Sequence, residues 1–209
     1  MGKAIQGMDF ICDIDGTLMN IEHRRHFVEG DKKDWKSFED NIKHDTLNKQ
    51  LNNLINLIEH IRWDRFEEET YDDVTEFDVG HFKNSVYYFS GRSEKLREIT
   101  VAQILTGIFQ NEYSLDKILK LIKNDNPKHD WKGFNLWRHF YKKTSDQLFL
   151  RADKDYREDS IVKSEMLDKL IETEGVNVNS LIIFDDRQSV VDMWRERGVT
   201  CFQVNKGDF

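Results

Sequence analysis

Four carboxylates in two short motifs are the side chains of this sequence best suited to chemistry. Asp13 and Asp15 belong to the run DIDGT, and Asp185 and Asp186 stand together in FDDR. If the fold brings both motifs together, a cation must neutralise them, because clustered like charges are costly. Oxygen ligands without His or Cys favour Mg²⁺. Two acids two residues apart, followed by a glycine that permits a turn, would supply one nucleophile and one acid or base.

Hydroxyl and basic residues accompany these acids in two further motifs. Ser90, Gly91 and Arg92 follow an apolar run, and Lys163 closes the segment YREDSIVK. Ser, Lys and Arg beside Mg²⁺ describe a site for a phosphate group. Each piece alone has a plainer explanation as a turn, a helix start or a solvated surface charge. The conjunction of all four motifs, in this order, is what favours a site.

The elements that must position these motifs are alternating strands and helices. Nearly continuous apolar runs predict five strands, at 8–14, 85–90, 147–152, 180–185 and 199–204. Apolar residues at three- and four-residue spacing predict helices at 46–62, 93–108, 159–174 and 187–197. Ser93 is the predicted N-cap of the second helix. The alternation predicts an α/β fold with a Rossmann-like parallel sheet flanked by helices. In such sheets ligands bind beyond the carboxyl ends of the strands, where the motifs stand.

The length of 209 residues predicts a single domain over 1–209. Two stretches fit the alternation poorly and are interpreted as insertions, the acidic 62–83 and the basic and aromatic 109–146. Trp35 and Phe38 are expected to pack a small helical cap over the site. In 117–143, lysines alternate with Trp131, Phe134 and Trp137, which form either a packing face or a lid that stacks single-stranded ends.

The net charge of -8 is unevenly distributed along the chain. Residues 64–78 hold most of the excess acid, whereas 117–143 is basic, so a nucleic-acid end is not excluded as substrate. Tight, sequence-independent binding along a duplex is disfavoured. Aromatic residues make up 12% of the chain, which argues against disorder. With two cysteines and no apolar run of membrane or signal-peptide type, we expect a cytoplasmic protein without a membrane partner.

Together the four motifs resemble those of the haloacid-dehalogenase-like phosphohydrolase superfamily. The resemblance implies a Rossmann-like fold and a mechanism through an aspartyl-phosphate. By this resemblance Asp13 attacks phosphorus, and Asp15 protonates the leaving oxygen and then activates water. Ser90 and Lys163 would complete the catalytic group by holding phosphoryl oxygens.

The same resemblance implies the ligands of the metal. Mg²⁺ would be held by Asp13, by the backbone carbonyl of Asp15 and by Asp186, with Asp185 in support. The reaction so implied is the Mg²⁺-dependent hydrolysis of a phosphoric monoester.

The C-terminal run IIFDDRQSVVDMWRERGVTCFQVNKGDF and the segment YREDSIVK resemble a narrower family, the 3′-phosphatase domain of phage-type polynucleotide kinase-phosphatases. The resemblance covers 8–61, 84–108 and 147–209. The substrate-binding positions that it implies are Thr17, Arg24, Gly91, Arg92, Arg157, Asp159 and Arg187. No GxxxxGK[ST] is present, so neither an ATP site nor 5′-phosphorylation is expected.

The sequence therefore predicts a hydrolase that removes 3′-phosphates from DNA or RNA ends, or from 3′-nucleotides, in nucleic-acid end repair. A phosphatase of free nucleotides or other small phosphoesters is the first alternative. A non-catalytic phosphate-binding module is the second, and a homo-oligomer stays open.

Overall fold

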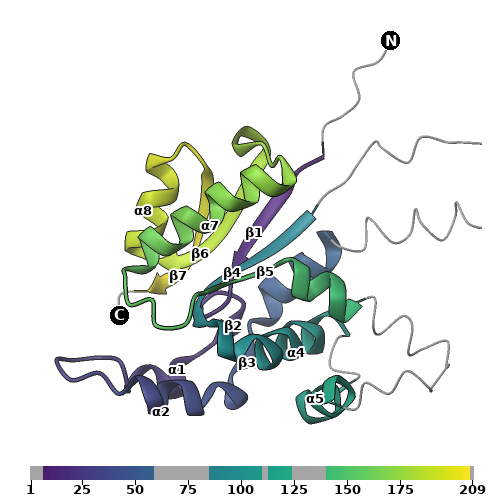
Figure 1. The fold of residues 1–209 in the computed structure, drawn as a ribbon, viewed down its shortest axis with the longest axis vertical. Coiled ribbons are helices and arrows are strands. Elements are labelled where there is room, and N and C mark those ends of the chain that lie inside the picture. The colour runs from purple at the N-terminus through teal and green to yellow at the C-terminus, as the bar shows by residue number, and fades with distance from the viewer. Residues whose placement is uncertain (1–6, 59–84, 110–112, 124–139, 208–209) are drawn as a thin grey trace, which may run out of the picture.

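The computed structural model describes residues 7–58, 85–109, 113–123 and 140–207. Its centre is a five-stranded sheet in the order β5-β4-β1-β6-β7, and every pairing in it is parallel (Figure 1). The strands are β1 (Asp9–Asp13), β4 (Ser85–Ser93), β5 (Leu148–Arg151), β6 (Leu181–Arg187) and β7 (Thr200–Gly207). The α/β, Rossmann-like fold predicted from the sequence is confirmed.

The register of the central strand decides which motifs meet. β1 pairs with β4 on one side, where Asp13 lies opposite Phe89, and with β6 on the other, where Cys12 lies opposite Phe184. The residues that directly follow these partners are Ser90 and Asp185. Because parallel strands end at the same edge, the motifs after β1, β4 and β6 share one edge of the sheet.

Helices cover both faces of this sheet (Figure 1). Phe10 and Cys12 of β1 belong to the core cluster shared with α4 (Arg97–Ile108), with α5 (Leu115–Lys123) and with the helical residues 49–58. Ile11 belongs to the opposite cluster, under α7 (Asp159–Glu174) and α8 (Gln188–Glu196). Burial on both faces explains why β1, β4 and β6 are apolar at successive positions.

Two predicted helix starts differ from the structure. Ser93 ends β4, and its hydroxyl donates to Asp153 instead of capping a helix. The 3₁₀ turn η2 (Glu94–Leu96) follows, and α4 begins at Arg97. The helix predicted from residue 46 begins at 49, because Thr46 and Leu47 form the short strand β3 (Thr46–Leu47).

The predicted helical cap lies between two short antiparallel strands, β2 (Met19–Asn20) and β3. It consists of α1 (Glu22–Arg25), α2 (Trp35–Asp40) and the 3₁₀ turn η1 (Ile42–His44). Asp34 caps α2 by accepting from the backbone N–H of Ser37 at 3.0 Å. Phe38 is buried against the core as expected, whereas Trp35 is 52% exposed.

The two predicted insertions are described only in part. The acidic stretch 62–83 lies outside the described residues. Of 109–146, the structure describes α5, which buries Ile118, and the helical residues 140–146, while Trp131, Phe134 and Trp137 lie outside. Within the described ranges, no helix has both the length and the apolar character needed to cross a membrane.

Candidate active site

Three buried carboxylates meet at the carboxyl edge of the sheet. Asp13 ends β1, and Asp185 and Asp186 lie near the end of β6. One carboxylate oxygen from each residue lies within 4.8 Å of the others. The donors are all oxygens, and Oδ2 of Asp13 is a buried atom without a hydrogen-bond partner among the described residues. A hard divalent cation fits this set, because its ligands would all be oxygens and it would neutralise the clustered negative charge.

Lys163 of α7 provides a positive charge inside this cluster. Its Nζ lies 2.6 Å from Oδ1 of Asp13 and 2.9 Å from Oδ2 of Asp185. Burial alone would lower the pKa of Lys163, but Asp13 and Asp185 outweigh it and raise that pKa. One ammonium group thus faces three carboxylates, which leaves negative charge for a cation to balance.

Burial also raises the pKa of two carboxyl groups in the cluster, those of Asp13 and Asp186. For Asp13, burial raises the pKa against the opposing effect of Lys163, and the neighbouring Asp185 and Asp186 raise it further. Burial, followed by the charge of Asp185, raises the pKa of Asp186 to about 6. Burial thus disfavours the ionised form of Asp13 and Asp186, and a bound cation would stabilise that form.

The two acids of β6 have different surroundings. Oδ2 of Asp185 accepts from Nζ of Lys163 and, at 3.3 Å, from Nε1 of the buried Trp194. Its Oδ1 accepts from the backbone N–H of Arg187 at 3.2 Å. Both carboxylate oxygens of Asp185 thus accept hydrogen bonds from protein groups, which suits a residue that supports the metal site.

Asp186 is enclosed by a hydroxyl group and two glycines. Oγ1 of Thr17 donates to Oδ1 of Asp186 at 3.3 Å. Gly16 has a φ of 90°, which favours glycine, and a Cβ there would collide with the Asp186 carboxylate. A Cβ at Gly207 of β7 would collide with the same carboxylate. The close approach of both segments to Asp186 therefore requires glycine at both positions.

Asp15 is held by two arginines. Its Oδ1 accepts from Nη2 of Arg24 and from Nη2 of Arg92, each at 2.6 Å. Burial would raise the pKa of Asp15, but the charges of Arg92 and Arg24 outweigh it and lower that pKa below its usual range. Both guanidinium groups also bind Asp45, whose own pKa is raised chiefly by burial. Asp15 is therefore ionised in this arrangement.

The second motif connects to the start of α7. Ser90 is buried, and its Oγ accepts from the backbone N–H of Arg92 at 3.2 Å. The Asp159 carboxylate is bound by Arg151 of β5 and by Arg187, and Arg151 also donates to the carbonyl of Gly91 at 3.0 Å. A Cβ at Gly91 would lie 2.6 Å from Oδ1 of Asp159. Three predicted substrate-binding positions, Gly91, Asp159 and Arg187, are thus brought together.

Arg157 is the predicted site residue that the structure does not bring into this group. Its guanidinium pairs with Asp155 at 2.7 Å and with Glu165 at 2.6 Å, and its side chain is 48% exposed. Only its backbone carbonyl takes part in the neighbouring network, by accepting from Nη1 of Arg151 at 2.6 Å. A role of the Arg157 side chain in substrate binding stays a prediction.

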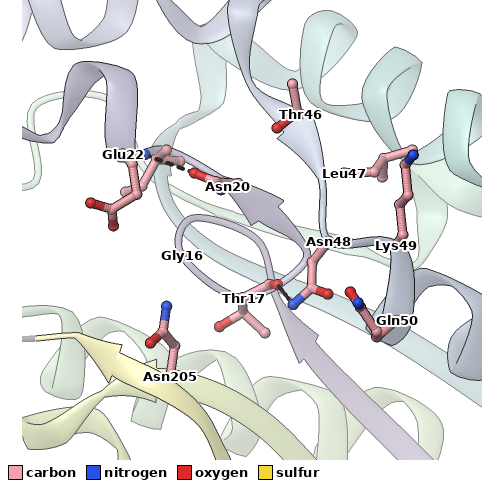
Figure 2. A pocket seen from close by; sticks show the side chains of 11 residues that line it. Gly16, Thr17, Asn20, Glu22, Thr46, Leu47, Asn48, Lys49, Gln50 and Asn205 are labelled. Atoms are coloured by element: carbon pink, nitrogen blue, oxygen red, sulfur yellow. Dashed lines mark hydrogen bonds between the residues drawn. The ribbon is translucent and has the colours of Figure 1, made fainter.

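A pocket of about 370 Å³ adjoins the loop that carries Gly16 and Thr17 (Figure 2). Amide and hydroxyl side chains dominate its lining, with Asn20, Thr46, Asn48, Gln50 and Asn205 among them. Nδ2 of Asn48 donates to the carbonyl of Thr17 at 3.2 Å, which ties the pocket wall to the loop (Figure 2). Such side chains both donate and accept, as the recognition of sugar and base groups requires.

Four residues of the site were not found from the sequence. They are Asp45 and Gln103 behind Asp15, Arg151 beside Asp159, and Trp194 beside Asp185. Asp45, Gln103 and Arg151 lie outside the motifs described above, and Trp194 lies in the C-terminal run but was given no role there. Arg151 alone stands at the end of a predicted strand, which was a usable signal.

Comparison with known proteins finds a family model that matches part of the chain. Residues 122–209 match the family model described as the polynucleotide kinase PNKP phosphatase domain. This range includes Lys163, Asp185 and Asp186, whereas Asp13 and Asp15 precede it. The resemblance inferred from the motifs, to haloacid-dehalogenase-like and PNKP-type phosphatases, is confirmed over these residues. The match supports a phosphatase.

Among solved structures, the chain is similar to one from the "Structure of the Pnkp1/Rnl/Hen1 RNA repair complex". The sequence identity is 24% and the TM-score 0.47, and the match covers 97% of this chain and 44% of that chain. The protein thus spans less than half the length of this relative.

Proposed function

We propose that the protein is a Mg²⁺-dependent phosphomonoesterase that works through an aspartyl-phosphate. One observation carries the proposal. Asp13 is buried, its Oδ1 is fixed by Lys163, and its Oδ2 has no hydrogen-bond partner among the described residues. An oriented carboxylate with one unengaged oxygen, beside the ammonium group of Lys163 that balances its charge, is suited to nucleophilic attack.

In the first step, Oδ2 of Asp13 forms a bond to phosphorus, and the bond from phosphorus to the leaving oxygen breaks. The leaving oxygen takes a proton from Asp15. Arg92 and Arg24 keep Asp15 ionised in the free site. Asp15 therefore receives this proton from the substrate, which binds as the monoanion of the phosphate ester. Ser90 and Lys163 hold phosphoryl oxygens meanwhile.

In the second step, Asp15 takes a proton from water, and the water oxygen attacks phosphorus. The bond between phosphorus and Oδ2 of Asp13 breaks, so that phosphate leaves and the Asp13 carboxylate is restored. The ionised state of Asp15 in the free site is the one that this step needs.

The residues present fit a magnesium ion. Asp13, Asp186 and the backbone carbonyl of Asp15 would hold it, with Asp185 in support. When bound, the ion would neutralise charge that develops on the phosphoryl oxygens.

The proposed substrate is a 3′-phosphorylated end of DNA or RNA, or a 3′-nucleotide, as an end-repair phosphatase would use. The family match at 122–209 and the motif resemblance support this choice. A specific observation favours a small phosphoester as the second candidate. The polar pocket beside Thr17, at about 370 Å³, is at the lower end of the size range of small-ligand pockets.

A rate comparison tests the proposal. Purified protein with Mg²⁺ is given an oligonucleotide with a 3′-phosphate, the same oligonucleotide with a 5′-phosphate, a 3′-mononucleotide and an aryl phosphate. We expect the 3′-phosphorylated oligonucleotide to react with a kcat/KM at least about tenfold above that of the 5′-isomer, a difference of about 1.4 kcal/mol in transition-state binding. Equal rates on oligonucleotide and mononucleotide would favour the second candidate. No hydrolysis of any of the four would contradict the phosphatase and leave a phosphate-binding module.

A further inference from the structure

Four atoms form a closed ring of alternating charge behind the catalytic loop. Oδ1 of Asp15 accepts from both Nη2 atoms, of Arg24 and of Arg92, at 2.6 Å. Oδ2 of Asp45 closes the ring by accepting from the same Nη2 atoms, at 2.7 Å from Arg24 and 2.8 Å from Arg92. Two positive and two negative side chains thus compensate one another without a substrate or an ion.

The ring joins the cap to the sheet. Arg24 lies in α1 and Asp45 directly before β3, whereas Asp15 follows β1 and Arg92 lies in β4. The side chains of Arg24 and Asp45 are 0% exposed and that of Arg92 is 2% exposed, but that of Asp15 is 17% exposed. Asp15 is therefore the member of the ring that can meet a substrate.

Contacts outside the ring hold both arginines in place. Nη1 of Arg92 donates to Oε1 of Gln103 at 2.6 Å and to Oγ1 of Thr100 at 3.1 Å. The guanidinium carbon of Arg24 lies 4.0 Å from the centre of the Phe38 ring. Nε of Arg24 donates to Oδ1 of Asp45 at 2.6 Å. Arg24 is thus fully engaged by protein groups.

The ring treats the two oxygens of Asp15 differently. Oδ1 accepts from Arg24 Nη2, Arg92 Nη2 and Arg92 Nε. Among the residues that the structure describes, Oδ2 accepts from Arg92 Nε alone, at 3.0 Å. A carboxylate bound in this way has one fixed oxygen and one that is left to exchange a proton. The orientation of Asp15 depends on the two arginines, and their positions depend on Asp45.

We propose that Asp45 is a positioning residue of the reaction, which fixes the Asp15 carboxylate for hydrolysis of the aspartyl-phosphate by holding both arginines. This inference rests on the proposed function. The side chain of Asp45 is fully buried and acts through Arg24 and Arg92. The competing interpretation is that the arginines capture the substrate phosphate directly, and it makes a different kinetic prediction.

The test compares the Asp45→Asn variant with the unsubstituted protein in the hydrolysis of an aryl phosphate. The good leaving group of this substrate needs little protonation. We expect kcat to fall about 10- to 100-fold, within the usual range for losing acid–base assistance, because water activation is slowed. The value of kcat/KM depends on the steps up to phosphorylation of Asp13. It is therefore expected to stay within about twofold of that of the unsubstituted protein. A burst of aryl alcohol and an increase in acid-trapped phosphoenzyme are expected to accompany these changes.

The matched control is Asp40→Asn, the same change in the same cap at an exposed residue that pairs with Lys36. Its kinetics are expected to equal those of the unsubstituted protein. A fall in kcat/KM for Asp45→Asn without phosphoenzyme accumulation would overturn the inference in favour of phosphate capture, and unchanged kinetics would overturn it outright. Failure of the unsubstituted protein to hydrolyse the aryl phosphate and the three nucleotide substrates above would reject the proposed function instead.

A second variant is needed because Asp45→Asn leaves two buried arginines partly uncompensated and can impair folding. Gln103→Met removes a hydrogen bond to Arg92 but keeps all four charges of the ring. We expect a smaller fall in kcat of the same kind, about 2- to 10-fold, again with phosphoenzyme accumulation. If Asp45→Asn does not fold, unchanged kcat and phosphoenzyme level in a folded Gln103→Met protein would overturn the inference.

Discussion

Asp13 shows at the residue scale how one carboxylate can be both fixed and reactive. Lys163 fixes Oδ1, and Oδ2 is left without a hydrogen-bond partner in the described part of the chain. Burying that oxygen costs folding free energy, which agrees with the raised pKa of Asp13. The side chain is therefore arranged for chemistry at the expense of stability.

We predict that Asp13→Asn abolishes turnover but leaves the fold intact. The amide has nearly the same shape, is a poor nucleophile, and removes a buried charge, while Lys163 keeps its contact with Asp185. We expect kcat to fall more than about 1,000-fold. The melting temperature is expected to stay the same or rise. Rates, acid-trapped phosphoenzyme and thermal unfolding check this. Activity within tenfold of the original would exclude Asp13 as the nucleophile.

Several of the residues found from the sequence stand in short motifs, either at strand ends or, like Lys163, in the first turns of a helix. Asp13, Asp15, Lys163 and Asp186 could be named before the structure because their types and order indicate a phosphate site. Asp45 could not be, because its importance depends on two arginines that reach it from α1 and from β4. Its neighbours in sequence carry no such information.

At the scale of elements, α7 is fastened to the sheet at its first residue. Asp159 binds Arg151 of β5 and Arg187 of β6, and it lies against Gly91 of β4. Lys163 follows one helical turn later on the same helix. The contacts of Asp159 therefore define where the ammonium group of Lys163 can lie.

We predict that Asp159→Ala lowers both stability and rate. Two partly buried arginines lose their partner, which is expected to reduce the free energy of unfolding by about 1–3 kcal/mol. The kcat is expected to fall as well, because Lys163 loses its positioning. Denaturant unfolding and rates with an aryl phosphate measure both effects.

The matched control for this prediction is Asp168→Ala, on the same helix. Asp168 pairs with Arg197, but its side chain is 63% exposed, and Arg197 keeps its contacts with Ser164. The loss of stability is expected to stay below about 1 kcal/mol, with no change in rate. Equal effects of the two substitutions would show that Asp159 has no special role.

The elements themselves were predicted better than their first residues. Continuous apolar runs identified all five strands of the described sheet, of which β1, β4 and β6 are buried at nearly every position. The start predicted for α4 was wrong, because the hydroxyl of Ser93 donates to Asp153, a residue that is distant in sequence. Helix-capping preferences consider only neighbouring residues in the sequence, so they do not predict such a partner.

At the scale of the whole molecule, the cluster of acids couples folding to pH and to metal. Burial and then Asp185 raise the pKa of Asp186 from 3.8 to about 6, so the folded protein binds this proton more tightly than the unfolded chain does. The contribution of Asp186 to stability is therefore largest at low pH and declines as pH rises towards about 6. A cation that needs the carboxylate competes with the same proton.

We predict that Mg²⁺ raises the melting temperature more at about pH 7.5 than at about pH 5. Above the pKa of Asp186, the ion binds without displacing a proton, so its stabilising effect is fully expressed. Thermal unfolding with and without Mg²⁺ at both pH values measures the difference. Asp186→Asn is expected to lose most of the increase at the higher pH. An equal increase at both pH values would argue against Asp186 as a ligand.

The central place of β1 in the sheet also governs the order in which the protein acquires its activity. β1 forms its ladders with β4 and β6, which come much later in the chain. Contacts between such distant segments form slowly, because the chain between them loses conformational entropy before the contacts can stabilise the fold. Asp13 is synthesised before Lys163 and Asp185 and can meet them only after both have been made. The proposed nucleophile is therefore made well before the groups that complete its site.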